Sequence, residues 1–277
     1  MSDHIVLLDV DKTILDEGYR LTVPLNLFRA GLMEIQRKGF RVGLNSDSAL
    51  YTLKRSAGIY RMMGPLVAER GAILLADKNA VPEYLNLDAR DFRILRNRFL
   101  QIILREHLEE YLLMVGDVNR LSTRLPPSPP DDCGARLVIL VNGLRSCSMG
   151  FYVRARDHAR WVCDVRSLDE VFALLNAVGS SMDSFWGERD VDLNPEYGIC
   201  IVHHAKTQKQ NVVGSIIKLF PKSPIYMVGD SMSDWMGDDV VHCAVANGKP
   251  EFKERCQFVA SSSYTAGVLE VLEHLCT

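Results

Sequence analysis

Two aspartates spaced two residues apart follow a short apolar run near the beginning of the sequence. Residues 5–8 (Ile-Val-Leu-Leu) predict a buried strand, and Asp9 and Asp11 come directly after it. On an extended strand this spacing directs both carboxylates to the same side. A second acidic group, Asp230 and Asp234, follows another short apolar run. Solubility does not explain why pairs of aspartates follow two buried strands. Their position indicates a chemical role.

Carboxylates gathered in one place repel each other and cannot all ionise without a cation. Mg²⁺ prefers oxygen ligands and is the expected neutralising ion. A lysine and a serine hydroxyl nearby would complete a site for a phosphoryl group. Phosphoryl transfer depends mainly on positioning and charge neutralisation, and an aspartate can act as the covalent acceptor.

The elements that must position these residues follow the order of a parallel α/β sheet. After the first strand, a helix is expected beyond Pro24, and a strand over residues 40–45 leads to Ser46. A further helix over about residues 49–61 and a strand over residues 66–68 continue the alternation. Alternating strands and helices predict a Rossmann-like sheet, in which ligands bind at the carboxyl ends of the strands. Residues far apart in sequence can therefore converge there.

The middle of the chain departs from this alternation. We expect one long amphipathic helix over about residues 88–114, an antiparallel strand pair over 136–142 and 149–155, and a helix opened by a capping box at Ser167–Glu170. Further strands are expected over 185–191 and 199–203.

This pattern predicts a separate α+β cap domain inserted into the α/β core. The predicted division is core residues 1–81, cap residues 82–195 and core residues 196–277. From Lys209 the alternation resumes, with a helix after Asp234 and strands at 225–228 and 243–246.

Composition narrows the class of protein. Charged residues make up 24% of the 277 residues and the formal net charge is −3, which gives no support for a nucleic-acid partner. No apolar run reaches the roughly 18 residues that a membrane span needs. The seven cysteines are dispersed without C-x-x-C spacing, which predicts reduced thiols in a cytoplasmic protein.

Taken in order, these motifs resemble those of the haloacid dehalogenase (HAD) superfamily of phosphatases. The similarity covers roughly residues 4–76 and 197–275, and the place of the insertion resembles the C2-capped, Cof-type branch of sugar and phosphoglycolate phosphatases. The matching segments are Asp9-Val10-Asp11-Lys12-Thr13, Ser46, Lys209, Gly229-Asp230-Ser231-Met232-Ser233-Asp234, and the segments 67–72 and 245–253.

The resemblance implies catalytic roles for the first motif and the lysine. Asp9 would be the nucleophile that forms an aspartyl phosphate. Asp11 would protonate the leaving oxygen and then activate water. Thr13 would hold the local turn, and Lys209 would neutralise charge on the nucleophile and the phosphoryl group.

It also implies the ligands of the metal ion. Asp230 would bind Mg²⁺ together with Asp9 and the backbone carbonyl of Asp11. Asp234 would be a second acidic position, bound to the metal directly or through water.

On the substrate side, Ser46 would hydrogen-bond a phosphoryl oxygen, and Asn247 sits where the family often contacts the substrate. Asp47 is placed beside Ser46. The family commonly has Thr-Gly-Arg where this chain has residues 46–48, Ser-Asp-Ser, so an anchoring arginine is lost and Asp47 adds a negative charge. The family's Asn-Gly turn is Arg70-Gly71 here.

Several alternatives remain open at this level. Lys206 lies one helical turn before Lys209 and competes for the lysine role, although Lys209 matches the register of the family helix. Thr13 and Ser46 could simply cap turns. The functional alternatives are a phosphotransferase or mutase with the same fold, or a non-catalytic binding protein.

The predicted function is therefore that of a Mg²⁺-dependent phosphomonoesterase acting on a small phosphorylated metabolite. Neither a nucleic acid nor a membrane is expected as a partner. The oligomeric state cannot be inferred from these features.

Overall fold

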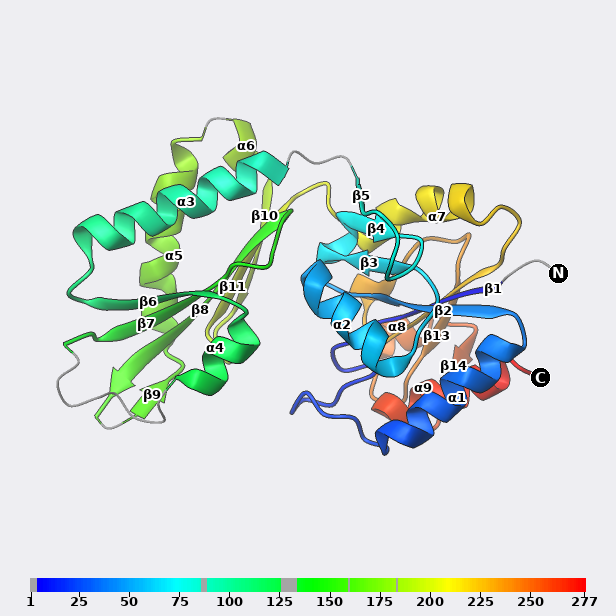
Figure 1. Ribbon diagram of the computed structural model, residues 1–277. Helices are drawn as coiled ribbons and strands as arrows, with labels where there is room; N and C mark the ends of the chain where they lie inside the picture. The colour runs from blue at the N-terminus through cyan, green and yellow to red at the C-terminus, as the bar shows by residue number, and fades with distance from the viewer. Residues whose placement is uncertain (1–3, 86–88, 126–133, 159, 183) are drawn as a thin grey trace. The chain divides into compact units, whose positions relative to one another are not determined.

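The computed structural model describes residues 4–85, 89–125, 134–158, 160–182 and 184–277. The chain forms two compact units (Figure 1). The core unit comprises residues 1–86 and 207–277, and the inserted unit comprises residues 87–206. Among the described residues, no helix has the length and apolar composition of a membrane span.

The core unit is built on an eight-stranded sheet of order β14-β13-β12-β1-β2-β3-β4-β5. The first six strands in this order are parallel, and β4 and β5 are antiparallel to their neighbours. The strands are β1 (His4–Leu8), β2 (Phe40–Asn45), β3 (Leu66–Ala68), β4 (Ile73–Leu75), β5 (Glu83–Tyr84), β12 (Ile225–Gly229), β13 (Val241–Ala244) and β14 (Phe258–Val259).

Helices cover both faces of this sheet, which is why all four residues of 5–8 are fully buried. Figure 1 shows α1 and α9 side by side, and the two helices are in contact. The buried residues of α1 are Phe28, Leu32 and Ile35, the face expected from their spacing. The helical segments are α1 (Leu25–Arg37), α2 (Leu50–Tyr60), α7 (Val213–Leu219), α8 (Pro250–Lys253), α9 (Tyr264–His274), and the 3-10 turns η1 (Glu69–Gly71), η2 (Lys209–Val212) and η3 (Met232–Asp234).

The register of the central strands determines where the polar residues emerge. Leu8 of β1 lies opposite Val228 of β12 and Leu44 of β2. The three strands therefore end level with one another. Residues that directly follow them in sequence leave the sheet at a single edge.

The inserted unit has a six-stranded sheet of order β10-β11-β8-β7-β6, with β9 paired to β8. Its strands are β6 (Tyr111–Gly116), β7 (Leu137–Asn142), β8 (Ser148–Asp157), β9 (Arg160–Val162), β10 (Arg189–Asn194) and β11 (Ile199–His204). Its helices are α3 (Ala89–Glu106), α4 (Val118–Arg124), α5 (Val165–Ser180) and α6 (Ser184–Gly187).

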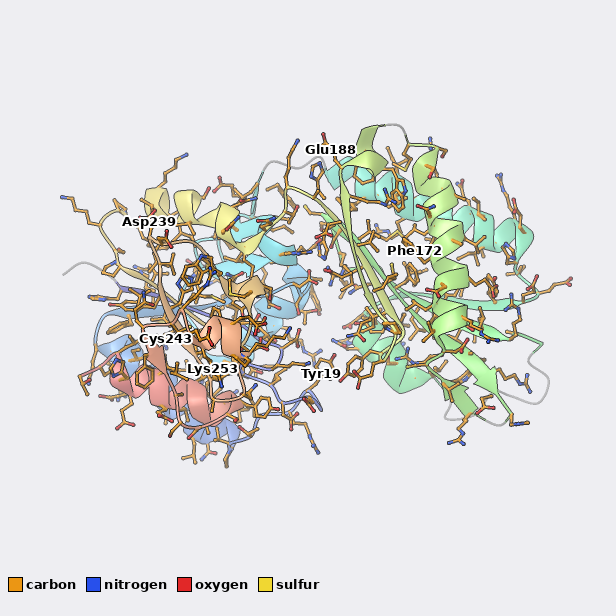
Figure 2. The ribbon with its side chains drawn as sticks, turned by 180° about the vertical axis from the view of Figure 1, so that it is seen from behind. Tyr19, Phe172, Glu188, Asp239, Cys243 and Lys253 are labelled. Carbon is orange, nitrogen blue, oxygen red and sulfur yellow. The ribbon has the colours of Figure 1, made fainter. Side chains whose placement is uncertain are left out.

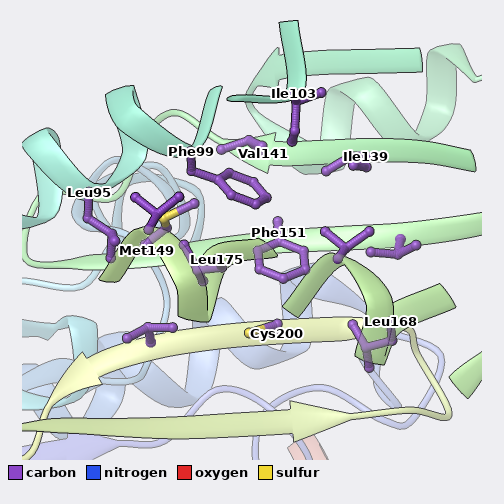
Figure 3. Packing of buried hydrophobic residues seen from close by; sticks show 14 of the residues in the cluster. Leu95, Phe99, Ile103, Ile139, Val141, Met149, Phe151, Leu168, Leu175 and Cys200 are labelled. Atoms are coloured by element: carbon purple, nitrogen blue, oxygen red, sulfur yellow. The ribbon is translucent and has the colours of Figure 1, made fainter. Parts of the chain in front are cut away.

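An apolar cluster joins α3 and α5 to one face of this sheet (Figure 3). Phe99 of α3 stacks on Phe151 of β8 with ring centroids 5.5 Å apart. Leu175 of α5 and Cys200 of β11 belong to the same cluster and are fully buried. The predicted antiparallel pair is present as β7 and β8.

The long helix predicted over residues 88–114 is wrong at its C-terminal end; residue 88 itself lies outside the described residues. Helix α3 ends at Glu106, and the apolar residues from Tyr111 onward form strand β6. A run such as Leu112–Val115 fits a helix or a strand equally well by periodicity. Pairing with β7 decides the outcome, since residues 111–116 align in parallel with 137–142.

Two further expectations for the inserted unit need correction. Helix α5 begins at Val165 rather than at a cap on Ser167, because Asp164 is its N-cap and accepts from the Ser167 amide at 2.8 Å. The strand predicted over 185–191 is instead the short helix α6 followed by β10. Trp186 of α6 is buried in the apolar cluster.

In the core unit, no regular helix follows Asp234. A 3-10 turn ends at this residue, and Gly237 has a φ of 97°, which interrupts helical geometry. The imidazole of His242 accepts a hydrogen bond from the Met236 amide at 2.9 Å and holds the segment in its non-helical path.

The second domain boundary also differs from the predicted one. Residues 199–204 were assigned to the core, but they form β11 and pair with β8 and β10 of the inserted unit. The sequence of a buried apolar strand does not indicate which of two sheets the strand will pair with. The boundary lies instead between residues 206 and 207.

Candidate active site

Asp9 is the first residue after β1, the strand between β2 and β12. Its amide donates to the Val228 carbonyl at 2.9 Å, which continues the sheet pairing and fixes the backbone at the sheet edge. Its side chain is almost completely buried, with 6% of the residue exposed. A carboxylate at this depth requires a partner of opposite charge.

Lys209 is that partner. Its ammonium group donates to Oδ1 of Asp9 at 2.7 Å and to Oδ1 of Asp234 at 2.6 Å. Burial acts to lower the pKa of Lys209, but the charges of Asp234 and Asp9 outweigh it and raise the pKa above its ordinary value. The lysine is therefore protonated and joins two segments far apart in the chain.

Lys209 is placed by a close backbone contact with η1. Gly71 has a φ of 91°, and a β-carbon there would lie 2.5 Å from the carbonyl oxygen of Gln208. Only glycine fits this conformation and this approach. The Arg70-Gly71 turn thus positions the lysine segment, a role that the motif spacing alone did not reveal.

Asp234 organises the second acidic loop. Its Oδ2 accepts hydrogen bonds from the amides of Asp230 at 2.9 Å and Ser231 at 3.3 Å, while Oδ1 binds Lys209. A β-carbon at Gly229 would lie 2.2 Å from this Oδ2, so the loop can close over Asp234 only with glycine at that position. Asp234 is fully buried and both of its oxygens are engaged.

Three carboxylates come close enough to share a cation. Single oxygens of Asp9, Asp230 and Asp234 lie within 4.8 Å of one another. Burial, then the charge of Asp234, raises the pKa of Asp230 to about 6. The pKa of Asp9 is raised well above its ordinary value by the same two causes, in that order.

When ionised, these three carboxylates carry more negative charge than the single ammonium group of Lys209 can neutralise. An all-oxygen donor set with uncompensated charge fits a hard divalent cation. The cluster could therefore hold a metal ion.

The turn after Asp9 is closed by backbone hydrogen bonds and is also fixed by a residue of α9. The amides of Ile14 and Leu15 both donate to the Val10 carbonyl, at 3.0 and 2.9 Å. Asp11 is exposed on this turn, whereas Thr13 is fully buried. The buried hydroxyl of Thr265 donates to the Ile14 carbonyl at 2.5 Å and ties the turn to α9.

The residues expected on the substrate side lie in two loops of the core unit. Ser46 follows β2, is 1% exposed, and accepts the Ser48 amide at 3.1 Å, which leaves its hydroxyl hydrogen available to another acceptor. Asp47, next to it, is half-buried. Asn247 uses both ends of its amide within the protein, donating to the Lys12 carbonyl at 2.7 Å and accepting the Tyr264 amide at 2.9 Å.

The two lysines that competed in the sequence have separate surroundings. Lys206 is exposed and pairs with Glu188 at 3.1 Å within the inserted unit. Lys209 alone reaches the carboxylates of Asp9 and Asp234.

A further layer supports the acidic loop. The Lys249 amide donates to the Asp230 carbonyl at 2.7 Å, and the side chain of Lys253, labelled in Figure 2, donates to the Ala246 carbonyl at 3.1 Å. His242 stacks on Trp235 at 4.0 Å, and burial lowers the pKa of its imidazole, which therefore stays neutral as an acceptor. Sequence reasoning missed His242 because a single histidine in a strand carries no motif.

Solved structures share this fold along almost the whole chain. A haloacid dehalogenase-like hydrolase from Bacteroides thetaiotaomicron is 14% identical, with a TM-score of 0.65 over 99% of both chains. A second protein of that organism, described as a phosphatase of the haloalkanoate (HAD) enzyme superfamily, is 15% identical, with a TM-score of 0.58 over 99% of this chain and 96% of that one. A HAD subclass IIB sugar phosphatase is 13% identical, with a TM-score of 0.58 over 99% of both chains.

Among protein-family models and curated proteins, none matches this sequence. The structural likeness confirms the predicted fold class: the chain has the fold of the HAD-like hydrolases, a Rossmann-like core with an inserted α+β unit.

Proposed function

We propose that the protein is a Mg²⁺-dependent phosphomonoesterase that hydrolyses a small organic phosphate, of the sugar phosphate or phosphoglycolate type, through an aspartyl phosphate on Asp9. The observation that carries this proposal is the buried arrangement of Lys209 between Asp9 and Asp234 at the carboxyl edge of a parallel sheet. Phosphatases of the HAD superfamily, a sugar phosphatase among them, have the same fold.

The geometry around Asp9 suits a nucleophile. Lys209 binds Oδ1, and among the described residues no hydrogen bond engages Oδ2. One oxygen is therefore held and the other is available for attack on phosphorus. The residues that would hold Mg²⁺ are Asp9, Asp230 and the Asp11 carbonyl, with Asp234 as a further acidic neighbour. When bound, this ion neutralises the carboxylates and the phosphoryl oxygens.

In the first step, Oδ2 of Asp9 forms a bond to phosphorus as the bond between phosphorus and the leaving oxygen breaks. Asp11, exposed on the turn, donates its proton to that oxygen. In the second step Asp11 takes a proton from water, whose oxygen attacks phosphorus and releases phosphate from Asp9. Lys209 and the Ser46 hydroxyl bind the phosphoryl oxygens throughout.

The test is release of inorganic phosphate from a panel of small phosphomonoesters, with Mg²⁺ and then with EDTA. We expect Mg²⁺-dependent release, reduced by more than about a thousandfold in Asp9→Asn because the nucleophile is lost. Asp239→Asn is the matched control, since Asp239 is an exposed aspartate outside the cluster (Figure 2). Near-normal rates in Asp9→Asn would reject the assignment.

An added acceptor sugar separates hydrolysis from transfer. A phosphotransferase or mutase would yield a phosphorylated sugar in place of free phosphate. A wild-type protein that binds Mg²⁺ but neither hydrolyses nor transfers would point to a non-catalytic role.

A further inference from the structure

The segment that follows Asp234 in sequence is irregular, although Asp234 itself must be held accurately. Residues 235–240, all of which the structure describes, belong to no helix or strand. Asp234 nevertheless accepts hydrogen bonds from Lys209 and from two backbone amides of the acidic loop. Its position therefore depends on contacts between this segment and more regular parts of the core unit.

His242 of β13 is a fixed point beside the segment. It lies opposite Met227 in the parallel pairing of β12 and β13. Its amide donates to Oε1 of Gln257 at 2.7 Å, and its carbonyl accepts the Gln257 amide at 2.9 Å. The residue is also fully buried. The backbone is thus held on both sides, and the imidazole has a defined place in the core unit.

The imidazole contacts the two residues that come directly after Asp234. Its ring stacks on Trp235, with centroids 4.0 Å apart and ring planes inclined by 12°. Its Nε2 accepts a hydrogen bond from the Met236 amide at 2.9 Å. An imidazole nitrogen accepts only when it carries no proton, so the proton of this neutral ring lies on Nδ1.

Met236 is held through its side chain as well. The side-chain amide of Asn45, the last residue of β2, donates to the Met236 sulfur at 3.2 Å, and both residues are buried. The segment after Asp234 is therefore fixed from β13 through a backbone amide and from β2 through a side chain.

These contacts affect the candidate site through Asp234. Its Oδ1 accepts from Lys209 at 2.6 Å, and its Oδ2 accepts from the Asp230 amide at 2.9 Å. A buried amide without an acceptor is costly, so a Met236 amide that lost His242 would shift toward another partner. Movement two residues beyond Asp234 would disturb both of these hydrogen bonds.

We propose that His242 is a positioning residue of the acidic cluster: by accepting the Met236 amide, its Nε2 sets the position of Asp234 and thereby the affinity of the site for a divalent cation. This inference rests on the proposed function, because it concerns the same cluster. Groups that orient the ligands of a metal ion without binding it commonly change its affinity by about tenfold or more.

The test is calorimetric titration with Mg²⁺ of the wild type and of two variants that separate the acceptor from the ring. His242→Phe keeps an aromatic ring over Trp235 but has no acceptor, and we expect its Mg²⁺ affinity to fall about fivefold or more. His242→Gln has no ring, but its side-chain oxygen can accept a hydrogen bond at nearly the same distance from the backbone as Nε2. We expect this variant to stay within about twofold of the wild type.

Two controls separate this role from a general loss of packing. His274→Phe makes the same substitution at another stacked histidine, since His274 of α9 lies over Phe258 with centroids also 4.0 Å apart. Phe28→Leu lowers the stability of the same unit at a fully buried position in α1. Both controls should bind Mg²⁺ as the wild type does, although the melting temperature of Phe28→Leu should fall.

The wild type supplies a second measurement, which decides the question even if His242→Phe does not fold. Nitrogen-15 NMR at neutral pH should show the proton of the His242 ring on Nδ1 and a hydrogen-bonded, unprotonated Nε2. A proton on Nε2 would overturn the inference, because that nitrogen could not then accept the Met236 amide.

Wild-type Mg²⁺ affinity in His242→Phe, or an equal loss in His242→Gln or in His274→Phe, would also overturn the role of His242. Absence of Mg²⁺ binding to the wild type would do the same. Binding needs no turnover, so the proposed function fails separately, if the wild type binds Mg²⁺ but releases phosphate from no ester.

Discussion

Every buried aspartate or glutamate among the described residues lies in the core unit, whereas the main buried cluster of the inserted unit is apolar. The core unit holds Asp9, Asp230 and Asp234 against a single buried lysine. The inserted unit keeps its carboxylates nearer the surface, where Glu170 and Glu110 pair with Arg136. Buried, incompletely neutralised charge is costly, so it marks the part of the molecule that is built for chemistry.

The largest effect should follow loss of the buried lysine. We expect Lys209→Ala to reduce phosphate release by more than about a thousandfold and to destabilise the core unit by about 3–5 kcal/mol, because two buried carboxylates lose their partner. The rate of phosphate release would measure the first effect, and urea unfolding would measure the second. Lys206→Ala, three residues earlier and exposed, should change neither; equal losses in both variants would contradict the assignment of the lysine.

Substitution of a residue in the apolar cluster of the inserted unit should lower stability without affecting the candidate site. Phe99→Ala should lower the free energy of unfolding by about 3–5 kcal/mol, since the ring is fully buried against Phe151. The Mg²⁺ affinity of the folded protein should not change, because the acidic cluster lies entirely in the core unit. Leu104→Ala, an exposed position on the same helix, should alter stability by less than about 0.5 kcal/mol.

If Phe99→Ala weakened Mg²⁺ binding as strongly as it weakened stability, the contrast between the two units would fail. Calorimetric titration at a temperature where the variant remains folded would decide this.

The smallest expected effects are changes in the free energy of unfolding with pH. The contributions of carboxyl groups in the two units should change with pH in opposite directions. The pKa of Asp230 is raised to about 6 from 3.8, so between these values the native state holds a proton that the unfolded state has released. Its contribution to stability therefore falls as pH rises through this window. Asp9, whose pKa is also raised, acts in the same direction.

In the inserted unit, the hydrogen bond from Arg136 lowers the pKa of Glu170 below 4.5. Its contribution is present above pH 4.5 and is lost as pH falls below that value. Urea unfolding of wild type, Asp230→Asn and Glu170→Gln from pH 3.5 to 7.5 would separate the two slopes. Parallel stability curves for wild type and Asp230→Asn would show that the Asp230 carboxyl does not titrate as described.

The elements of the core unit were predicted better than those of the inserted unit, because the signals in the core lie within short segments of sequence. Residues 5–8 are apolar without interruption, as expected for a strand covered on both faces, and the aspartate motif that follows them supports this assignment. In the insertion, residues 111–114 were assigned to a helix although they belong to β6, because their apolar pattern suits either element. The choice depended on a partner strand that lies beyond them in sequence.

Among the site residues too, those in local motifs were predicted, whereas those whose roles depend on distant contacts were not. The spacing of Asp9 and Asp11, and the acidic loop of Asp230 and Asp234, could be found from sequence because short motifs following strands are local signals. The role of Gly71 could not be predicted, although its turn was noted, because that role is a close contact with Gln208. His242 was not noted at all, because its role is a hydrogen bond with the Met236 amide.

The sequence by itself thus determined the type of sheet, the presence of an inserted unit and the carboxylates at the strand ends. Tertiary structure alone decided that Asn247 is engaged by two backbone groups and that β11 joins the inserted sheet, and it agrees with the preference for Lys209 over Lys206 as the partner of Asp9. Local patterns specify what an element is, because periodicity and turn chemistry act between near neighbours. Which elements meet depends on register and packing between distant segments, and no short stretch of sequence contains that information.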